Sequence, residues 1–314
     1  MRLVRILAIF TYNLLISCLF LPLIFIDSCS VAHRVYLCIS PLFIPLFFKR
    51  FFRKSYNLCG NFGDSSNGKV GAYLINLDVA VDRLNTVLSK ISRLPFPVER
   101  VSAVDGRFLS REQISRIADL KSYRRYFKMA PEAGTLGCAL SHAKVWRKFL
   151  ESDNQFALVF EDDVVFNVRE LSAAVTAAVR RKNLWDVVSF ELNHHGNPRK
   201  ISALSVGESL VVYLTNVQHA GCYLVNRRTA REFLNRFYPI KMPLDHYFTA
   251  SWEFDISFCG VEPRIVRQRS CRSQIKISDS KKIRSPAVLL PNAIYHIKRS
   301  AIHTIYNLYQ LLLS

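Results

Sequence analysis

The sequence predicts an α/β fold in which a mostly parallel sheet is flanked by helices. Short apolar runs typical of buried strands alternate with helical patterns from about residue 72 onward, as in parallel sheets covered by helices. The chain has 314 residues, 50% of them hydrophobic and 21% charged, which is enough to bury a sizeable core. We expect the domain over residues 72–285, an apolar segment at 1–54, a linker at 55–71 and a helical tail at 286–314.

The first part of the domain contains two strand patterns, each followed by a helix. Residues 73–77 form a short apolar run, and residues 81–91 have helical spacing. A second strand is predicted at 97–104. Ser110 suits the N-cap of a helix over 111–119, because its hydroxyl can accept a backbone N–H.

The second part begins with a helix at 137–151, where Leu140, Ala143, Trp146 and Leu150 share one face. The elements predicted after it are a strand at 156–160, a helix at 170–182, strands at 186–192 and near 210–214 and 222–226, and a short helix at 227–237.

Three acids, Glu161, Asp162 and Asp163, follow the apolar run 156–160. Burying unpaired carboxylates is costly, and ligands of such sheets bind at the carboxyl ends of strands. Because residues i and i+2 of an extended chain point the same way, Glu161 and Asp163 could share a divalent cation, with Asp162 facing the other side. Oxygen ligands suit Mg²⁺ or Mn²⁺ held together with substrate phosphates. Alternatively, these acids cap the next helix or pair with arginines.

A second interpretation of the acids is the aspartyl-phosphatase pattern DxDx[TV]. The nucleophile position would then be Glu161, with Asp163 third and Val165 fifth. We rank this interpretation low, because a glutamate nucleophile is disfavoured and the downstream Gly/Ser turn that cradles phosphate is absent.

The net charge of +19 indicates an anionic partner. No helix-turn-helix, RNP or zinc-knuckle pattern is present, so we expect no nucleic acid. The eight cysteines form no CxxC motif and no Cys/His cluster at zinc spacing, which argues against a metal knuckle or disulfide framework and favours a reducing compartment.

The N-terminus predicts membrane association. Residues 6–26 are mostly apolar and long enough to span a bilayer, although a cleaved signal peptide is a competing interpretation. Residues 35–48 are too short for an ordinary span and are followed by the basic stretch 49–54, which favours an interfacial segment on an anionic membrane surface and a cytoplasmic domain.

Seven blocks, in order, resemble glycosyltransferase family 25, which includes bacterial lipooligosaccharide galactosyltransferases and animal procollagen galactosyltransferases. The resemblance covers about two-thirds of the chain, and its most specific feature is GCALSH followed by EDD. The blocks are YLINLDVAVDR (73–83), SAVDG (102–106), GTLGCALSHAKVWRKF (134–149), ALVFEDDVVF (157–166), LWDVVSFEL (184–192), AGCYLVNRRTA (220–230) and MPLDHYF (242–248).

The resemblance implies a GT-A-like enzyme that transfers galactose or glucose from a UDP-sugar with inversion. It also implies that EDD acts as the metal motif, with Glu161 and Asp163 as ligands of Mn²⁺ or Mg²⁺. A carboxylate on the opposite face of the sugar must then take the acceptor's proton; we expect Asp245 in this role, with Glu191 second.

Six further residues are candidates for binding the donor: Asn76, Asp78, Arg83, Ser141, His142 and Asp162. Turn capping and a surface salt bridge are alternative roles for the first three. His142 is expected to line the pocket or form a structural hydrogen bond, and Cys138 to pack. His219 could approach the sugar.

The acceptor expected from the resemblance is a glycan such as the lipopolysaccharide or lipooligosaccharide core, at the cytoplasmic face of a bacterial inner membrane. Two alternatives are an inactive homologue that binds nucleotide-sugar or glycan and a membrane interaction protein. Apolar residues recur at helical spacing in the tail, which predicts a helix lying on the bilayer or packed on the domain: Ile294, Ile297, Ala301, Ile305, Leu308 and Leu312.

Overall fold

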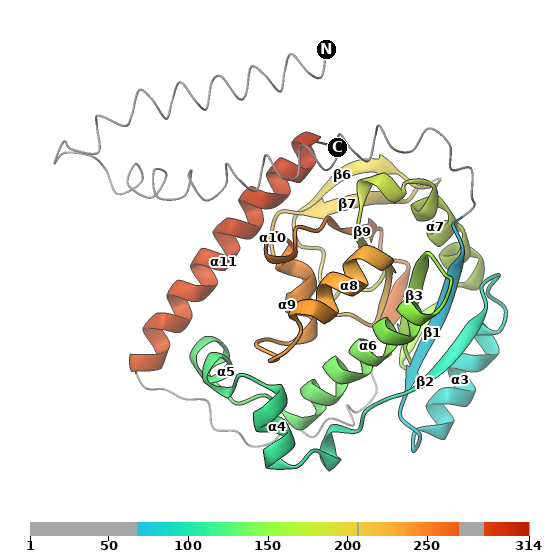
Figure 1. Ribbon diagram of the computed structural model, residues 1–314. Coiled ribbons are helices and arrows are strands. Elements are labelled where there is room, and N and C mark those ends of the chain that lie inside the picture. Colours follow the sequence, from blue (N-terminus) through green and yellow to red (C-terminus); the bar gives the residue numbers. More distant parts are fainter. Residues whose placement is uncertain (1–67, 206, 270–285, 314) are drawn as a thin grey trace, which may run out of the picture. The chain divides into compact units, whose positions relative to one another are not determined.

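The computed structural model describes residues 68–205, 207–269 and 286–313. Its main feature is an eight-stranded sheet in the order β2-β1-β3-β8-β5-β9-β7-β6 (Figure 1). The strands are β1 (Val70–Asn76), β2 (Val98–Ser102), β3 (Phe156–Glu161), β5 (Val187–Ser189), β6 (Pro198–Ala203), β7 (Ser209–Tyr213), β8 (Cys222–Asn226) and β9 (Phe258–Glu262).

The sheet contains both parallel and antiparallel strand pairs, so the prediction of a mostly parallel sheet is wrong. β1 pairs in parallel with β2 and β3, and β5 pairs in parallel with β9. The four remaining pairs are antiparallel, with β8 inserted between β3 and β5. The reason is that β5, β6, β7 and β8 follow one another without an intervening α-helix, and a parallel pair needs such a crossover.

Helices cover both faces of the sheet. Along β1, Tyr73 and Ile75 pack into one apolar cluster and Ala72 and Leu74 into the other, because successive strand side chains point to opposite faces. The first cluster includes residues of α6 (Ala133–Glu151), α8 (Arg227–Arg236) and α9 (Leu244–Thr249). The second includes residues of α3 (Val81–Ile91) and α7 (Val168–Arg180).

Shorter elements complete the domain. Ser110 is the N-cap of α4 (Arg111–Ile117) and forms a reciprocal capping box with Gln113. This confirms the predicted N-cap. α5 (Leu120–Phe127) and α10 (Ser251–Phe254) were not expected from the sequence. A two-stranded ribbon pairs β4 (Val164–Phe166) with β10 (Val266–Gln268) in antiparallel orientation, and it brings the 264–269 segment beside the acids.

The last helix, α11 (Pro286–Leu313), packs against α5, α10 and β7 and runs along one edge of the domain in Figure 1. Its buried side is largely polar. Arg299 donates to the carbonyl of His246 and lies 4% exposed, and the fully buried His303 contacts the carbonyl of Thr249. Its exposed apolar residues are Leu290, Ile294, Ile297, Leu308 and Leu312.

Within the described residues, no helix has both the length and the apolar character needed to cross a membrane. The predicted membrane segment 1–54 and most of the predicted linker lie outside those residues.

Candidate functional site

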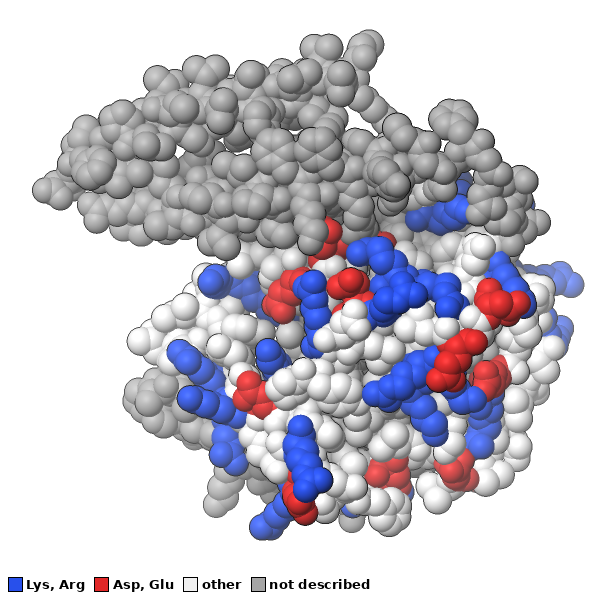
Figure 2. All heavy atoms as spheres, viewed as in Figure 1, with Lys and Arg blue, Asp and Glu red and all other residues white. Residues whose placement is uncertain are grey.

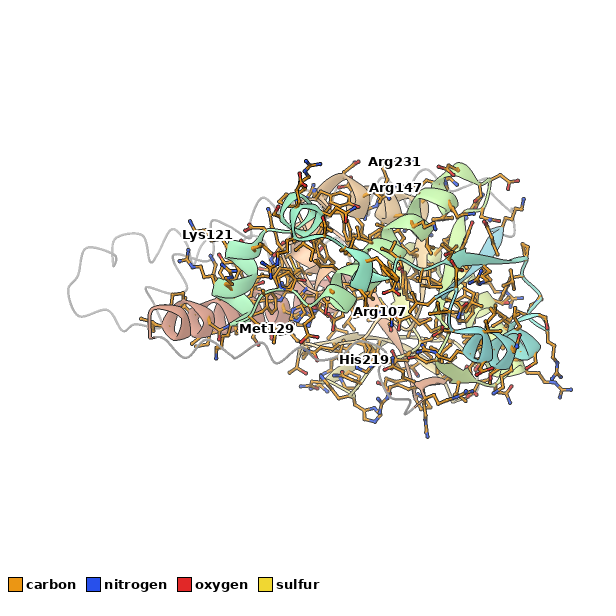
Figure 3. All side chains as sticks on the ribbon, turned by 90° about the horizontal axis from the view of Figure 1, so that it is seen from below. Arg107, Lys121, Met129, Arg147, His219 and Arg231 are labelled. Atoms are coloured by element: carbon orange, nitrogen blue, oxygen red, sulfur yellow. The ribbon has the colours of Figure 1, made fainter. Side chains whose placement is uncertain are left out.

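A cleft of about 810 Å³ opens at the carboxyl ends of four strands. Its lining includes residues that end or directly follow β1, β2, β3 and β5, and α6 contributes one wall. This is where open α/β sheets bind ligands. Arg107 and His219, which both line the cleft, lie in the central part of Figure 3.

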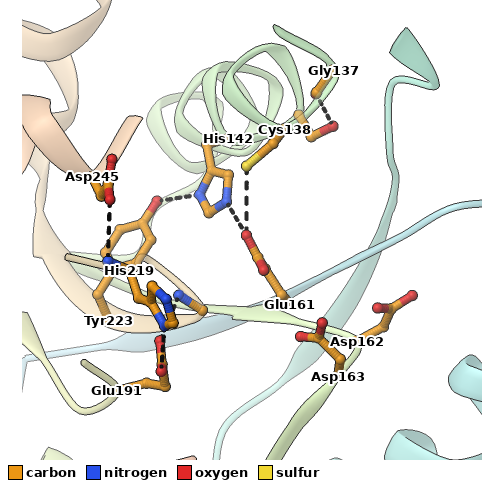
Figure 4. Close-up of polar contacts among 12 residues, drawn as sticks. Gly137, Cys138, His142, Glu161, Asp162, Asp163, Glu191, His219, Tyr223 and Asp245 are labelled. Carbon is orange, nitrogen blue, oxygen red and sulfur yellow. Dashed lines mark hydrogen bonds and ion pairs between the residues drawn. The ribbon is translucent and has the colours of Figure 1, made fainter. Parts of the chain in front are cut away.

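The first two acids of the triplet point to opposite sides, as the strand alternation predicts. Glu161 follows Ala157 and Val159 on the α6 face, and its Oε1 lies 3.3 Å from His142 Nε2 and 3.6 Å from Cys138 Sγ (Figure 4). Burial acts to raise the pKa of Glu161, but the contacts with His142 and Cys138 leave it below its usual value.

Asp162 faces α3 instead. Its Oδ2 accepts a hydrogen bond of 2.7 Å from Asn76 Nδ2, and its Oδ1 forms an ion pair with Arg83. Two predicted donor-site residues therefore hold Asp162 in place, and the charge of Asp162 is already compensated.

Asp163 departs from the alternation, because β3 ends at Glu161 and the chain turns. Its Oδ2 lies 3.4 Å from Arg83 Nη2 and accepts from Gln268 Nε2 at 3.1 Å, so it shares Arg83 with Asp162. Its Oδ1 is buried and has no hydrogen-bond partner. Burial, followed by the neighbouring charge of Glu161, raises the pKa of Asp163 to about 6.

The unpartnered Oδ1 of Asp163 fits a divalent cation. A buried carboxylate oxygen with no donor is costly, and a hard cation is stabilised by carboxylate oxygens supplemented by substrate phosphates. In the described part of the chain, Asp163 is the member of the triplet with such an unsatisfied atom.

Ser141 and His142 line the cleft and also fix α6. Ser141 Oγ donates to the Gly137 carbonyl at 2.6 Å and accepts from Val104 N at 2.8 Å. His142 is fully buried, and its Nδ1 lies 2.9 Å from Tyr223 Oη. The side chains of both residues therefore hold the wall in place.

Two glycines permit the contact between α6 and the loop after β2. A Cβ on Gly106 would lie 1.7 Å from the Ala133 carbonyl oxygen, and one on Gly137 would lie 2.6 Å from the Val104 carbonyl oxygen. No real side chain tolerates such distances. The backbones of the SAVDG and GCALSH blocks therefore pack directly against each other beside the cleft.

Glu191 and His219 form a pair on another wall. Glu191 is 2% exposed, and its Oε1 lies 3.0 Å from His219 Nδ1. The hydrogen bond to Glu191 raises the pKa of His219 above its usual value despite partial burial. His219 has a φ of 85°, which is uncommon for a residue with a Cβ and is found at sites where the surroundings impose strain.

Asp245 and Asp78 do not line the cleft. Asp245 accepts the backbone N–H of His219 at 3.3 Å through Oδ2 and that of His246 at 3.0 Å through Oδ1. Exposed Asp78 accepts from Ser102 Oγ at 2.7 Å and pairs with Arg100. The cleft brings together the other eight predicted residues: Asn76, Arg83, Ser141, His142, Glu161, Asp162, Asp163 and Glu191.

Arginines also line the cleft. Besides Arg83, they are Arg107, Arg264, Arg267 and Arg269. Three of them belong to a stretch rich in Lys and Arg over residues 264–284, and the fourth, Arg107, directly follows the SAVDG block; none of the four was among the predicted site residues. On the face drawn in Figure 2, Lys and Arg side chains are spread widely among fewer acidic ones. Five acids also line the cleft, so it has no net formal charge; the arginines nevertheless supply guanidinium groups that suit the phosphate oxygens of an anionic ligand.

A family model described as "Glycosyltransferase family 25 (LPS biosynthesis protein)" matches residues 70–248. A glycosyltransferase 25 family member from Anopheles gambiae is 34% identical over 123 residues, which are 38% of this chain and 21% of that protein. Procollagen galactosyltransferase 1-A from Xenopus laevis is 27% identical over 188 residues, covering 58% of this chain and 31% of that protein. The match thus spans about a fifth to a third of these relatives.

Among solved structures, S. aureus TarS superposes with a TM-score of 0.39 at 14% identity, covering 64% of this chain and 36% of that chain.

Proposed function

Because the chain belongs to glycosyltransferase family 25, we propose that it transfers a hexose, galactose or glucose, from a UDP-sugar to a glycan. The family supports a transferase, and relatives named procollagen galactosyltransferases support a hexose donor. The observation that carries the donor site is the buried, unpartnered Oδ1 of Asp163 in a cleft lined by arginines.

Asp163 would hold the divalent ion, Mn²⁺ or Mg²⁺, with Glu161 or Asp162 as the second carboxylate. When bound, such an ion supplies Lewis-acid stabilisation of the negative charge on the departing diphosphate. Arg83 orients Asp162 and Asp163. The arginines at 107, 264, 267 and 269 provide donors for phosphate oxygens.

For the proton of the acceptor hydroxyl, the contacts favour the pair of His219 and Glu191 over Asp245. Glu191 lines the cleft and holds His219 Nδ1, which orients Nε2 as the ring nitrogen that would take the proton. Glu191 then stabilises the imidazolium that forms. Asp245 has both oxygens on backbone N–H groups and acts as a positioning residue for the His219 loop.

The acceptor we propose is a lipopolysaccharide or lipooligosaccharide core at the cytoplasmic face of a bacterial inner membrane. The family description, which refers to lipopolysaccharide biosynthesis, and the net charge of +19 support an anionic membrane surface as a partner. No nucleic acid is proposed.

The outward face of α11 supports membrane association independently. Its exposed apolar residues recur at helical spacing on one side: Leu290, Ile294, Ile297, Leu308 and Leu312. The helix contains no Asp or Glu, and its buried side chains, among them Arg299 and His303, face the domain. An apolar stripe without acids beside exposed Lys298 suits an interfacial position on a bilayer.

The alternative is a homologue that binds nucleotide-sugar or glycan without turnover. The contact of Arg83 with both Asp162 and Asp163 favours it, since an arginine can neutralise an acidic site that lacks a metal.

The test is release of UDP from a panel of UDP-sugars with Mn²⁺ or with a chelator. We expect turnover with a hexose donor that is lost with chelator and in Asp163→Asn. The matched control is Asp153→Asn, which changes an exposed aspartate paired with Lys69 and should leave turnover unchanged. UDP-sugar binding without any turnover under all conditions would instead support the inactive homologue.

A further inference from the structure

Three cleft residues outside the Asp163 contacts bring metal-ligating atoms together. Cys138 Sγ, His142 Nε2 and Glu161 Oε1 all lie within 4.8 Å of one another. Figure 4 shows the side chains of Cys138 and His142 both pointing toward Glu161. We propose that these three residues form a tetrahedral site for a borderline-soft divalent cation such as Zn²⁺, separate from the nucleotide's metal at Asp163.

Two of the three distances between these atoms agree with the edges of a tetrahedral zinc site, and the third, from Sγ to Nε2, is at most 4.8 Å. Zn–S bonds of about 2.3 Å and Zn–N or Zn–O bonds of about 2.0–2.1 Å give tetrahedral edges of about 3.5 Å between S and O and about 3.3–3.4 Å between N and O. The observed separations are 3.6 Å from Sγ to Oε1 and 3.3 Å from Nε2 to Oε1. In the metal-free structure the same separation is a long hydrogen bond between the imidazole and the carboxylate, and the two atoms would not need to move apart to bind one cation.

The local structure holds the three groups in this arrangement. Cys138 and His142 lie four residues apart on α6, which places them on one helical face. Glu161 is directed at that face by the alternation of β3, because Ala157 and Val159 pack there.

The imidazole also has the outer hydrogen bond that metal-bound histidines need. Tyr223 Oη lies 2.9 Å from His142 Nδ1 and accepts from Trp146 Nε1 at 3.0 Å. With Nδ1 occupied by Tyr223, Nε2 is the ring nitrogen that faces Glu161, and it would bind the cation as the tautomer protonated on Nδ1.

The sequence alone indicated no such cluster, because α6 supplies only two of its ligands. The third comes from β3, about twenty residues later, and reaches α6 only in the folded sheet. The prediction that Cys138 only packs did not include its contact with Glu161.

The site differs from the Asp163 site in chemistry and in position, and because it uses Glu161, the second carboxylate for the nucleotide's metal would be Asp162. It combines sulfur, nitrogen and oxygen ligands, which suit zinc, whereas Mg²⁺ and Mn²⁺ prefer oxygen. The side chain of Asp163 contacts Arg83 and Gln268 rather than α6. Because all three ligands line the cleft, the fourth position of the tetrahedron faces the cleft and can take water or a substrate hydroxyl, as in zinc sites with an open position.

The experiment titrates the metal-free full-length protein with Co²⁺, a spectroscopic substitute for Zn²⁺, without nucleotide. We expect a thiolate-to-cobalt charge-transfer band and intense tetrahedral d–d bands that saturate near one equivalent and are displaced by Zn²⁺. Cys138→Ser should abolish the charge-transfer band. Cys222→Ala removes a different buried thiol and should retain it, as should Asp163→Asn.

Retention of the band in Cys138→Ser would overturn the proposal, and so would its loss in Asp163→Asn, which would mean one shared metal site. X-ray absorption on the zinc-loaded wild-type protein decides the matter even if Cys138→Ser fails to fold. A first shell with one sulfur and nitrogen or oxygen neighbours is expected, and a shell without sulfur would contradict the assignment.

Discussion

Arg83 and His142 are the side chains that compensate the acids at the end of β3. Arg83 forms an ion pair with Asp162 and reaches Asp163, while His142 contacts Glu161. Three carboxylates thus share one guanidinium and one imidazole. Asp163 is the carboxylate whose negative charge is least compensated, and burial and the charge of Glu161 raise its pKa to about 6. The folded protein without a cation therefore pays a free-energy penalty at this residue.

Asp163→Asn should stabilise the metal-free protein. Because the pKa of Asp163 is raised in the folded state, its ionised form destabilises folding, and the amide should increase the free energy of unfolding at pH 8 by roughly 1–2 kcal/mol. As the pH falls through 6 toward the unfolded value, the wild-type carboxyl becomes protonated and the difference should vanish. Chemical denaturation at pH 8 and pH 4.5, in chelator, measures both values. If Asp163→Asn lowered the free energy of unfolding by the same amount at both pH values, burial of the ionised Asp163 would not be the cause of a stability penalty.

The pair Glu191 and His219 predicts a pH signature. Since Glu191 raises the pKa of His219, the acidic limb of the rate profile should lie above the ordinary histidine value of about 6.5. Glu191→Gln should move this limb to lower pH and reduce kcat by about 10²-fold or more. Asp245→Asn should change kcat less, because Asp245 acts through the backbone of His219. A larger loss in Asp245→Asn than in Glu191→Gln would restore Asp245 as the base.

At the scale of elements, local sequence patterns predicted the strands and helices that form the cleft, but they did not predict how all of the strands pair. The helix at 81–91 and the cap at Ser110 follow from spacing and capping chemistry. The mixed pairing of β8 was not predictable, because strand orientation depends on contacts between distant segments. The position of Asp163 was missed for a local reason, since β3 stops at Glu161 and the two-residue alternation ends with it.

The close contact of α6 with the loop after β2 gives a prediction for Gly106. Gly106→Ala would place a Cβ 1.7 Å from the Ala133 carbonyl oxygen, so the loop or the start of α6 must move. We expect a loss of at least about 2 kcal/mol in the free energy of unfolding, together with weaker UDP binding.

Ser110→Ala is the matched control, because it removes the cap of α4. It should cost about 1 kcal/mol and leave UDP affinity intact. If Gly106→Ala had the same free energy of unfolding and the same UDP affinity as the wild type, the close backbone contact would not be needed for either.

At the scale of the whole molecule, α11 buries polar groups and exposes apolar ones. Arg299, His303 and Gln310 face the domain, whereas Ile294 and Ile297 are 56% and 70% exposed. The helical spacing of the tail was visible in the sequence, but the side that packs against the domain was not, because an apolar stripe usually turns inward. In this chain the inward side includes Arg299, His303 and Tyr306, which hydrogen-bond to carbonyls of α9 and of the loop after α10.

The double change Ile294→Glu and Ile297→Glu should weaken binding to vesicles that contain anionic lipid, because it places charge in the apolar stripe. Thermal stability should change little, since both side chains are exposed. Ser300→Glu adds negative charge at an exposed position of the same helix outside the stripe and should have a smaller effect. Vesicle sedimentation of the full chain measures this, and equal binding by wild type and the double variant would exclude α11 as a membrane contact.

The central claim is that Asp163 binds a divalent ion that joins the protein to the donor's diphosphate. The most direct measurement is calorimetric titration of UDP into wild type and Asp163→Asn, each with Mn²⁺ and with chelator. The claim predicts tight binding only for wild type with Mn²⁺, and a variant whose UDP affinity does not respond to the metal. Wild-type affinity that is the same with Mn²⁺ and with chelator would contradict it.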